Sequence, residues 1–98
     1  MEYLKMYNIS QQQIEELEDK YNDGIIDFLI SEKEFIIKKL EYLKERNYLL
    51  FPILENNIKI FLEEMKTLQK KIEKMENKGY SKKTIQMILM NDQLYNEV

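Results

Sequence analysis

The side chains of this chain that can do chemistry are hydroxyls, carboxylates and amines, because the sequence contains no histidine and no cysteine. Its three serines, Ser10, Ser31 and Ser81, each stand where a helix is predicted to begin. Nucleophilic catalysis is not expected, because both the usual general base and the alternative nucleophile are missing. We therefore interpret the serines as helix caps and predict that the protein is not an enzyme.

The carboxylates do not form a metal or acid/base pattern. Paired glutamates lie on charged helix faces beside lysines, whereas an acid/base pair needs an apolar pocket around one member. The stretch DKYNDG begins like a calcium loop, with Asp19, Asp23 and Gly24 at positions one, five and six. Tyr21 at position three and Ile30 in place of the bidentate glutamate exclude that loop. We expect no metal and no cofactor.

Lysine pairs recur along the chain. Lys38 and Lys39 fall at positions equivalent to Lys70 and Lys71, and Lys82 and Lys83 follow the third helix break. If the chain folds as stacked units, equivalent lysines form a row that can follow a phosphate backbone. The alternative is a solvated face on which lysines pair with nearby glutamates. The net charge of −3 provides no overall basic field to attract nucleic acid.

A few residues could anchor a protein partner. Tyr3 and Tyr42 lie at the edge of the predicted apolar faces, and Phe51 lies in a turn before Pro52. Such aromatic side chains either form binding anchors or cover a small core. Lys39 falls inside the apolar arc of its helix, so its amine must snorkel or meet a carboxylate, which a partner could supply.

The residues that begin and end helices set the predicted elements. Ser10 followed by Gln13, and Ser31 followed by Glu34, are capping-box patterns, and Gly79 can end a helix in the left-handed conformation. Residues 2–8 are predicted to form the last turns of a short first helix. Further helices are predicted near 11–21, 32–47, 53–60, 63–78 and 82–90, with a turn at 22–24.

The chain is predicted to contain about two and a half copies of one helical unit. EYLK occurs at Glu2 and at Glu41, where two copies of the unit begin. A third copy of the unit begins at Glu73 with EKME, so the offsets are 39 and 32 residues. Apolar residues follow in register: Leu4, Leu43 and Met75; Ile9, Tyr48 and Tyr80; and Ile14, Ile53 and Ile85. A period of 30-odd residues indicates a helical repeat. We predict an all-α, right-handed helical-repeat stack of five to six helices, a single domain over residues 1–98 with units near 2–40, 41–72 and 73–98.

The two long predicted helices differ in their apolar faces. The helix over 32–47 is apolar over about 220° and should contact neighbours on more than one side. Residues 61–78 carry a narrow seam with 4-3-4-3 spacing and should be peripheral. The same seam supports an alternative fold. A continuous helix over 53–78, about 39 Å long, would form an antiparallel hairpin or a coiled-coil dimer.

The repeated helical unit resembles the repeats of the mitochondrial transcription termination factor (mTERF) family. The resemblance rests on YLKMYNISQQQI and KMENKGYSKKTIQMILMNDQLY, in which a helix end is followed by a polar or small residue, an apolar residue, a serine and a new helix. It implies helical units stacked into a curved solenoid that binds nucleic acid along a basic concave face.

Composition and size favour a binding role in the cytoplasm. Hydrophobic residues make up 44% of 98 residues, which suits a modest core that a partner can extend. The longest apolar stretch, YLLFPIL, is too short to span a membrane. We predict a non-enzymatic protein-binding module, for example a phage- or mobile-element-type inhibitor or adaptor acting by surface occlusion. The alternatives are an mTERF-like nucleic-acid binder and a structural coiled-coil homodimer.

Overall fold

The computed structural model describes residues Met1 to Val98, and it contains helices and no strand. The predicted all-α class is therefore confirmed, although nine helical segments form instead of five to six. They are η1 (Glu2–Tyr7, a 3₁₀-helix), α1 (Gln11–Lys20), α2 (Asp23–Ser31), α3 (Lys33–Glu45), α4 (Leu50–Asn56), α5 (Lys59–Leu62), α6 (Met65–Asn77), α7 (Lys82–Leu89) and α8 (Asp92–Asn96).

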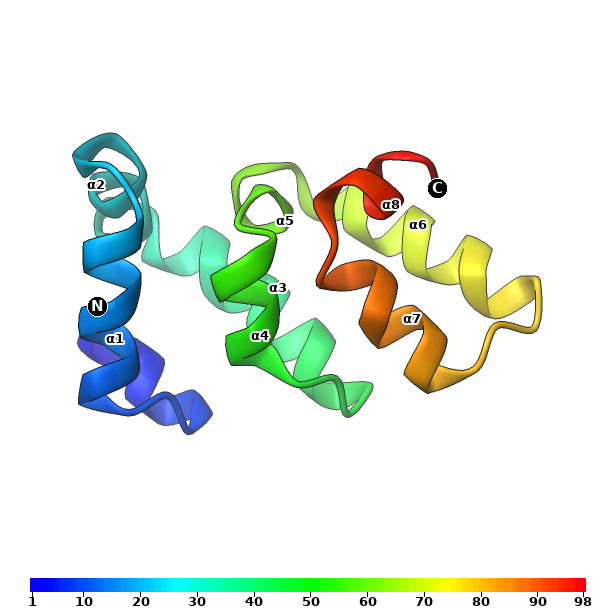
Figure 1. Ribbon diagram of the computed structural model, residues 1–98, viewed down its shortest axis with the longest axis horizontal. Coiled ribbons are helices and arrows are strands. Elements are labelled where there is room, and N and C mark those ends of the chain that lie inside the picture. Colours follow the sequence, from blue (N-terminus) through cyan, green and yellow to red (C-terminus); the bar gives the residue numbers. More distant parts are fainter.

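The helices follow one another along an elongated body of 36 × 23 × 21 Å. The helices η1, α1 and α2 occupy one end, α3 to α5 the middle, and α6 to α8 the other end (Figure 1). Helix α3 packs against α2, α4, α5 and α6. The prediction that the middle long helix has neighbours on several sides is thus confirmed.

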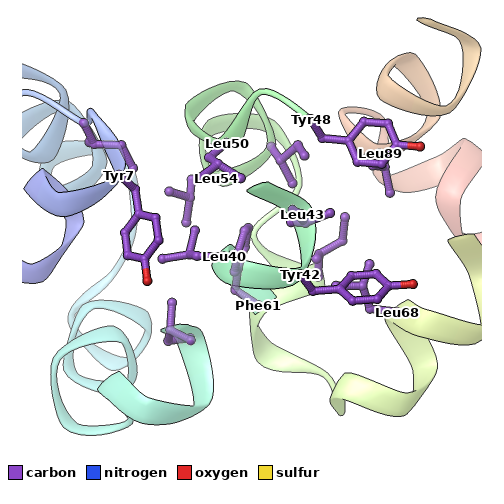
Figure 2. Packing of buried hydrophobic residues seen from close by; sticks show 14 of the residues in the cluster. Tyr7, Leu40, Tyr42, Leu43, Tyr48, Leu50, Leu54, Phe61, Leu68 and Leu89 are labelled. Atoms are coloured by element: carbon purple, nitrogen blue, oxygen red, sulfur yellow. The ribbon is translucent and has the colours of Figure 1, made fainter. Parts of the chain in front are cut away.

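One apolar core of 23 buried residues runs through all three parts of the molecule. Its centre is drawn in Figure 2, where side chains from α3, α4 and α5 meet between the two ends. Two of the predicted apolar registers are buried throughout: Leu4, Leu43 and Met75, and Ile14, Ile53 and Ile85. In the third register Ile9 and Tyr48 are buried, but Tyr80 is 42% exposed. The residues of this register therefore recur in sequence but differ in burial.

Three turns share one backbone conformation. The turn residues Asn8, Asn47 and Gly79 have φ values of 62°, 63° and 80°. The residue after each donates its backbone N–H to a carbonyl five residues earlier, so Ile9 bonds Leu4, Tyr48 bonds Leu43 and Tyr80 bonds Met75. This is the six-to-one bond of a Schellman cap. Asparagine and glycine tolerate the left-handed conformation that the cap requires.

The segment after α1 differs from the prediction. The turn expected at 22–24 is instead the start of α2, because the Asn22 side chain accepts a hydrogen bond from the Ile25 N–H at 2.9 Å and caps the helix. Ser31 is the last residue of α2, so it does not cap the following helix, and the capping box expected with Glu34 is wrong. Helix α3 begins after Glu32 without a side-chain cap.

The alternative of one continuous helix over 53–78 is wrong. The chain leaves helical geometry at Asn57, with φ −148° and ψ 64°. It leaves it again at Glu63, which is extended at φ −90° and ψ 172°. The Asn57 amide instead donates to the Leu89 carbonyl at 3.0 Å. A contact far away in sequence therefore holds the break that separates α4 from α5.

The expected unit boundaries after residues 40 and 72 fall inside α3 and α6, because Glu41 and Glu73 lie in the middle of these helices. The longest helices, α3 and α6, have 13 residues each. None of the helices is both long and apolar enough to cross a membrane.

Candidate functional site

A groove of about 380 Å³ opens between the turn that follows η1 and the turn that joins α3 to α4. We call it the turn-side groove. Its apolar lining comes mainly from the second turn and the start of α4. It is lined by Tyr7, Asn8, Ile9, Gln13, Lys44, Tyr48, Leu49, Leu50, Phe51 and Pro52.

Leu49 is the most exposed large hydrophobic residue of this lining, with 64% of its surface accessible. It occupies the N-cap of α4, where its side chain caps nothing. The corresponding N-caps of α1 and α7 are Ser10 and Ser81, which accept from the N–H three residues later. At α4 that third residue is Pro52, which has no N–H to donate. A serine at position 49 would therefore lack its usual partner.

The backbone of Leu49 is held from another part of the chain. Its N–H donates to the Gln86 Oε1 at 2.8 Å, and its carbonyl accepts from the Gln86 Nε2 at 3.2 Å. The Gln86 side chain of α7 thus fixes the backbone at the start of α4. The Leu49 side chain neither caps the helix nor enters the core, so the fold itself makes no use of a leucine here.

The walls of the groove are well fixed. The Tyr7 ring is buried, and its hydroxyl donates to the Glu41 Oε1 at 2.6 Å. Burial, together with the adjacent Glu41 carboxylate, raises the pKa of Tyr7 to about 12, so the hydroxyl remains a donor at neutral pH. Lys44 is the one charged residue of the lining, and its amine lies 5.6 Å from the centroid of the Tyr7 ring. The groove therefore has a mainly apolar lining with a single cation, Lys44.

Phe51, predicted as a partner anchor, is half-buried and lines this groove. The other two aromatic candidates belong to the core. Tyr3 is buried and donates its hydroxyl to the Leu29 carbonyl at 2.6 Å. Tyr42 is also buried, with the Arg46 guanidinium 4.1 Å from its ring centroid. The chain covers most of both rings, although Tyr42 also lines a third hollow between α3 and α6. Tyr3 is therefore a core residue, whereas a binding role for Tyr42 stays a prediction.

Lys39 needs no carboxylate from a partner. Its side chain is fully buried, and its amine donates to the backbone carbonyl of Glu63 while lying 3.8 Å from the Phe35 ring centroid. Desolvation by burial lowers the pKa of Lys39 from 10.5 to about 8, against the opposing effect of the Glu63 charge. The expected role of Lys39 in partner or nucleic-acid binding is therefore corrected: the amine stabilises the break after α5.

The lysine rows divide into two groups. Lys71, 32 residues after Lys39, donates to the Tyr95 carbonyl at 3.0 Å and lies 4.1 Å from the Tyr95 ring centroid. The remaining members are exposed: Lys38, Lys70, Lys82 and Lys83. Two of the six predicted nucleic-acid residues are thus held by backbone carbonyls, which leaves an interrupted set of free amines.

The sequence contained a signal for Leu49 that the prediction missed. A leucine at an N-cap, with proline at the third helical position, breaks a local preference that the chain satisfies at Ser10 and Ser81. Tyr48 and Tyr7 could not be assigned to a groove from sequence, because their turns meet only in the folded chain.

No three acidic side chains gather in a way that could hold a metal ion. Comparisons of the chain with protein-family models, with curated proteins and with solved structures return no match. The resemblance to the mTERF family stays a prediction. The groove is therefore interpreted from its own geometry.

Proposed function

We propose that this protein is a non-enzymatic helical protein-binding module that takes an apolar segment of another protein into the turn-side groove. The observation that carries the proposal is Leu49, a leucine 64% exposed at a position where the fold has no use for it. Exposed apolar residues beside preformed hollows are typical of binding anchors. The module acts by covering a surface of its partner, as an inhibitor or adaptor does.

The lining suggests the chemistry of the bound segment. Leu49 and Phe51 offer apolar contact, and Lys44 at the edge favours a carboxylate on the partner. We therefore expect a segment with a large apolar side chain and an adjacent aspartate or glutamate. The hydroxyls of Ser10 and Ser81 are committed to helix caps, which favours binding over catalysis.

We also propose that the fold is a short stack of helical repeats whose units begin at η1, α3 and α6. Two kinds of recurrence support it. The left-handed turn residues Asn8, Asn47 and Gly79 recur at the 39- and 32-residue offsets of the sequence register. Lys39 and Lys71, 32 residues apart, each bond a carbonyl 24 residues further along. A stack of this kind presents successive turns along one edge, where the groove lies.

The test uses a photo-crosslinking amino acid at position 49 to identify the partner in cells. Binding of the purified partner is then measured by calorimetry. Leu49→Asp is expected to weaken binding by about 30-fold, the loss typical of an anchor worth 2 kcal/mol. The matched control is Ile30→Asp, because Ile30 is 51% exposed on α2 and lines no groove.

The control variant is expected to bind like the wild type. Equal affinities for the wild type and Leu49→Asp would overturn the proposal. So would equal losses in both variants, because the effect would then come from added charge and not from the groove. Circular dichroism of each variant establishes that the helices are retained.

A further inference from the structure

A second groove, of about 400 Å³, lies at the end of the molecule formed by α6, α7 and α8. We call it the end-face groove. Three of the six large hydrophobic residues that the molecule exposes line it: Tyr80, Met87 and Leu94. These helices form the end opposite α1 (Figure 1). Nothing in the chain packs over these three side chains, and the turn-side groove shares no lining residue with it.

The chain covers the related position in its middle part. Tyr48 stands 32 residues before Tyr80, in a turn with the same left-handed residue and the same six-to-one hydrogen bond. Tyr48 is only 5% exposed, and the Lys82 amine of α7 lies 5.9 Å from its ring centroid. Figure 2 shows Tyr42 and Tyr48 extending toward the C-terminal helices. Tyr80 is 42% exposed, because neither α7 nor α8 packs over its ring as α7 packs over Tyr48.

An ion pair joins the surface around Tyr48 to the C-terminal helices, and the end-face groove around Tyr80 has no such pair. Arg46 Nε lies 3.5 Å from the Glu76 Oε2 of α6, which joins the middle helices to the C-terminal ones. Lys78, 32 residues after Arg46, lines the end-face groove together with Lys74 and Glu97. None of these three charges forms an ion pair within the chain. The groove therefore carries unpaired charges of both signs around an apolar centre.

We propose that the end-face groove is the interface of a two-fold symmetric homodimer. In a two-fold interface the same patch meets itself, so a patch that carries both signs of charge can pair a cation of one copy with a carboxylate of the other. Glu97 of one copy faces Lys78 of the other, which supplies the carboxylate that Glu76 supplies to Arg46 inside the chain. Tyr80, Met87 and Leu94 of both copies form the apolar centre. This interface leaves the turn-side groove free for another protein.

Sedimentation equilibrium of the purified chain, from about 10 µM to about 1 mM, tests the proposal. A reversible monomer–dimer equilibrium with no larger species is expected. Met87→Asp, at a side chain 55% exposed, should weaken the dimer at least tenfold without loss of helix content. Leu49→Asp, in the other groove, should leave the dimer unchanged.

A charge exchange tests the orientation. Glu97→Lys and Lys78→Glu should each weaken the dimer, and the double variant Glu97→Lys with Lys78→Glu should restore it. A wild type that stays monomeric throughout overturns the proposal. Three other results would also overturn the proposal. They are a dimer that Met87→Asp does not weaken, a double variant that dimerises more weakly than either single variant, and growth into larger open-ended species. Loss of the dimer in Leu49→Asp would place the second copy in the turn-side groove and also overturn it.

Discussion

Replacing Lys39 by methionine is expected to abolish a gain in stability that the wild-type protein shows between pH 7 and pH 9. Lys39 is fully buried, and its amine meets only the Glu63 carbonyl and the Phe35 ring. Its pKa is about 8 in the folded protein, against 10.5 for an exposed lysine. Methionine keeps most of the apolar stem and removes the titrating group.

The sign and size follow from proton linkage. Below pH 8 both states carry the proton, and the folded state bears the full cost of the buried charge. Between the two pKa values the unfolded state binds more protons, so the free energy of unfolding rises with pH. A shift from 10.5 to about 8 corresponds to about 3 kcal/mol in full. Between pH 7 and pH 9 the folded protein loses the Lys39 proton, and the free energy of unfolding rises by about 1 kcal/mol.

Urea denaturation at several pH values in this range measures the effect. Buried tyrosines oppose this rise in stability slightly. Burial raises the pKa of residues such as Tyr3 and Tyr21 to about 12, so tyrosines ionise first in the unfolded state, and their ionisation favours that state. Their contribution up to pH 9 is below about 0.5 kcal/mol in total, and it cancels in the comparison between wild type and variant. Lys38→Met, at the exposed neighbour, is the control and should retain the wild-type slope.

The expected result is a difference in pH slope between wild type and Lys39→Met, with Lys38→Met following the wild type. The absolute stability of Lys39→Met carries less information, because the change also leaves the Glu63 carbonyl without its donor. If the wild type and Lys39→Met show parallel pH profiles, the amine titrates like an exposed lysine. The account of Lys39 as a buried structural cation would then be refuted.

Four further substitutions test the local account of the fold, each by urea denaturation at pH 7. Ser10→Ala should lose about 1 kcal/mol, because it removes a complete capping box, whereas Ser31→Ala should be nearly neutral; equal losses would contradict the assigned helix boundaries. Gly79→Ala should cost about 1 kcal/mol through its φ of 80° alone, since no atom lies within 4 Å of the added methyl group; an unchanged midpoint would count against the left-handed turn. Asn57→Ala should cost about 1–3 kcal/mol, because the buried Leu89 carbonyl loses its donor, and a neutral result would show that this bond does not hold the break after α4.

Local features of the sequence predicted much of the helical framework. The capping box at Ser10, the cap at Ser81 and the left-handed Gly79 were all predicted, because each depends on residues within one turn of the chain. The start of α2 was missed, since Asn22 followed by aspartate and glycine is typical of a turn as well as of a helix cap. The candidate site was predicted only at Phe51, because the adjacent Leu49 was missed and the opposite wall comes from the turn after η1, which meets this segment only in the folded chain.

What the sequence by itself determined is the apolar register. Leu4, Leu43 and Ile53 are buried as their spacing requires, because helical periodicity fixes which side of a helix can be dehydrated. Only the tertiary structure decided which of two equivalent residues, Tyr48 or Tyr80, is covered. Burial depends on whether a neighbouring helix packs on that side, and identical local patterns carry no information about the neighbour. For the same reason Lys39 found a backbone carbonyl inside the chain rather than a carboxylate on a partner.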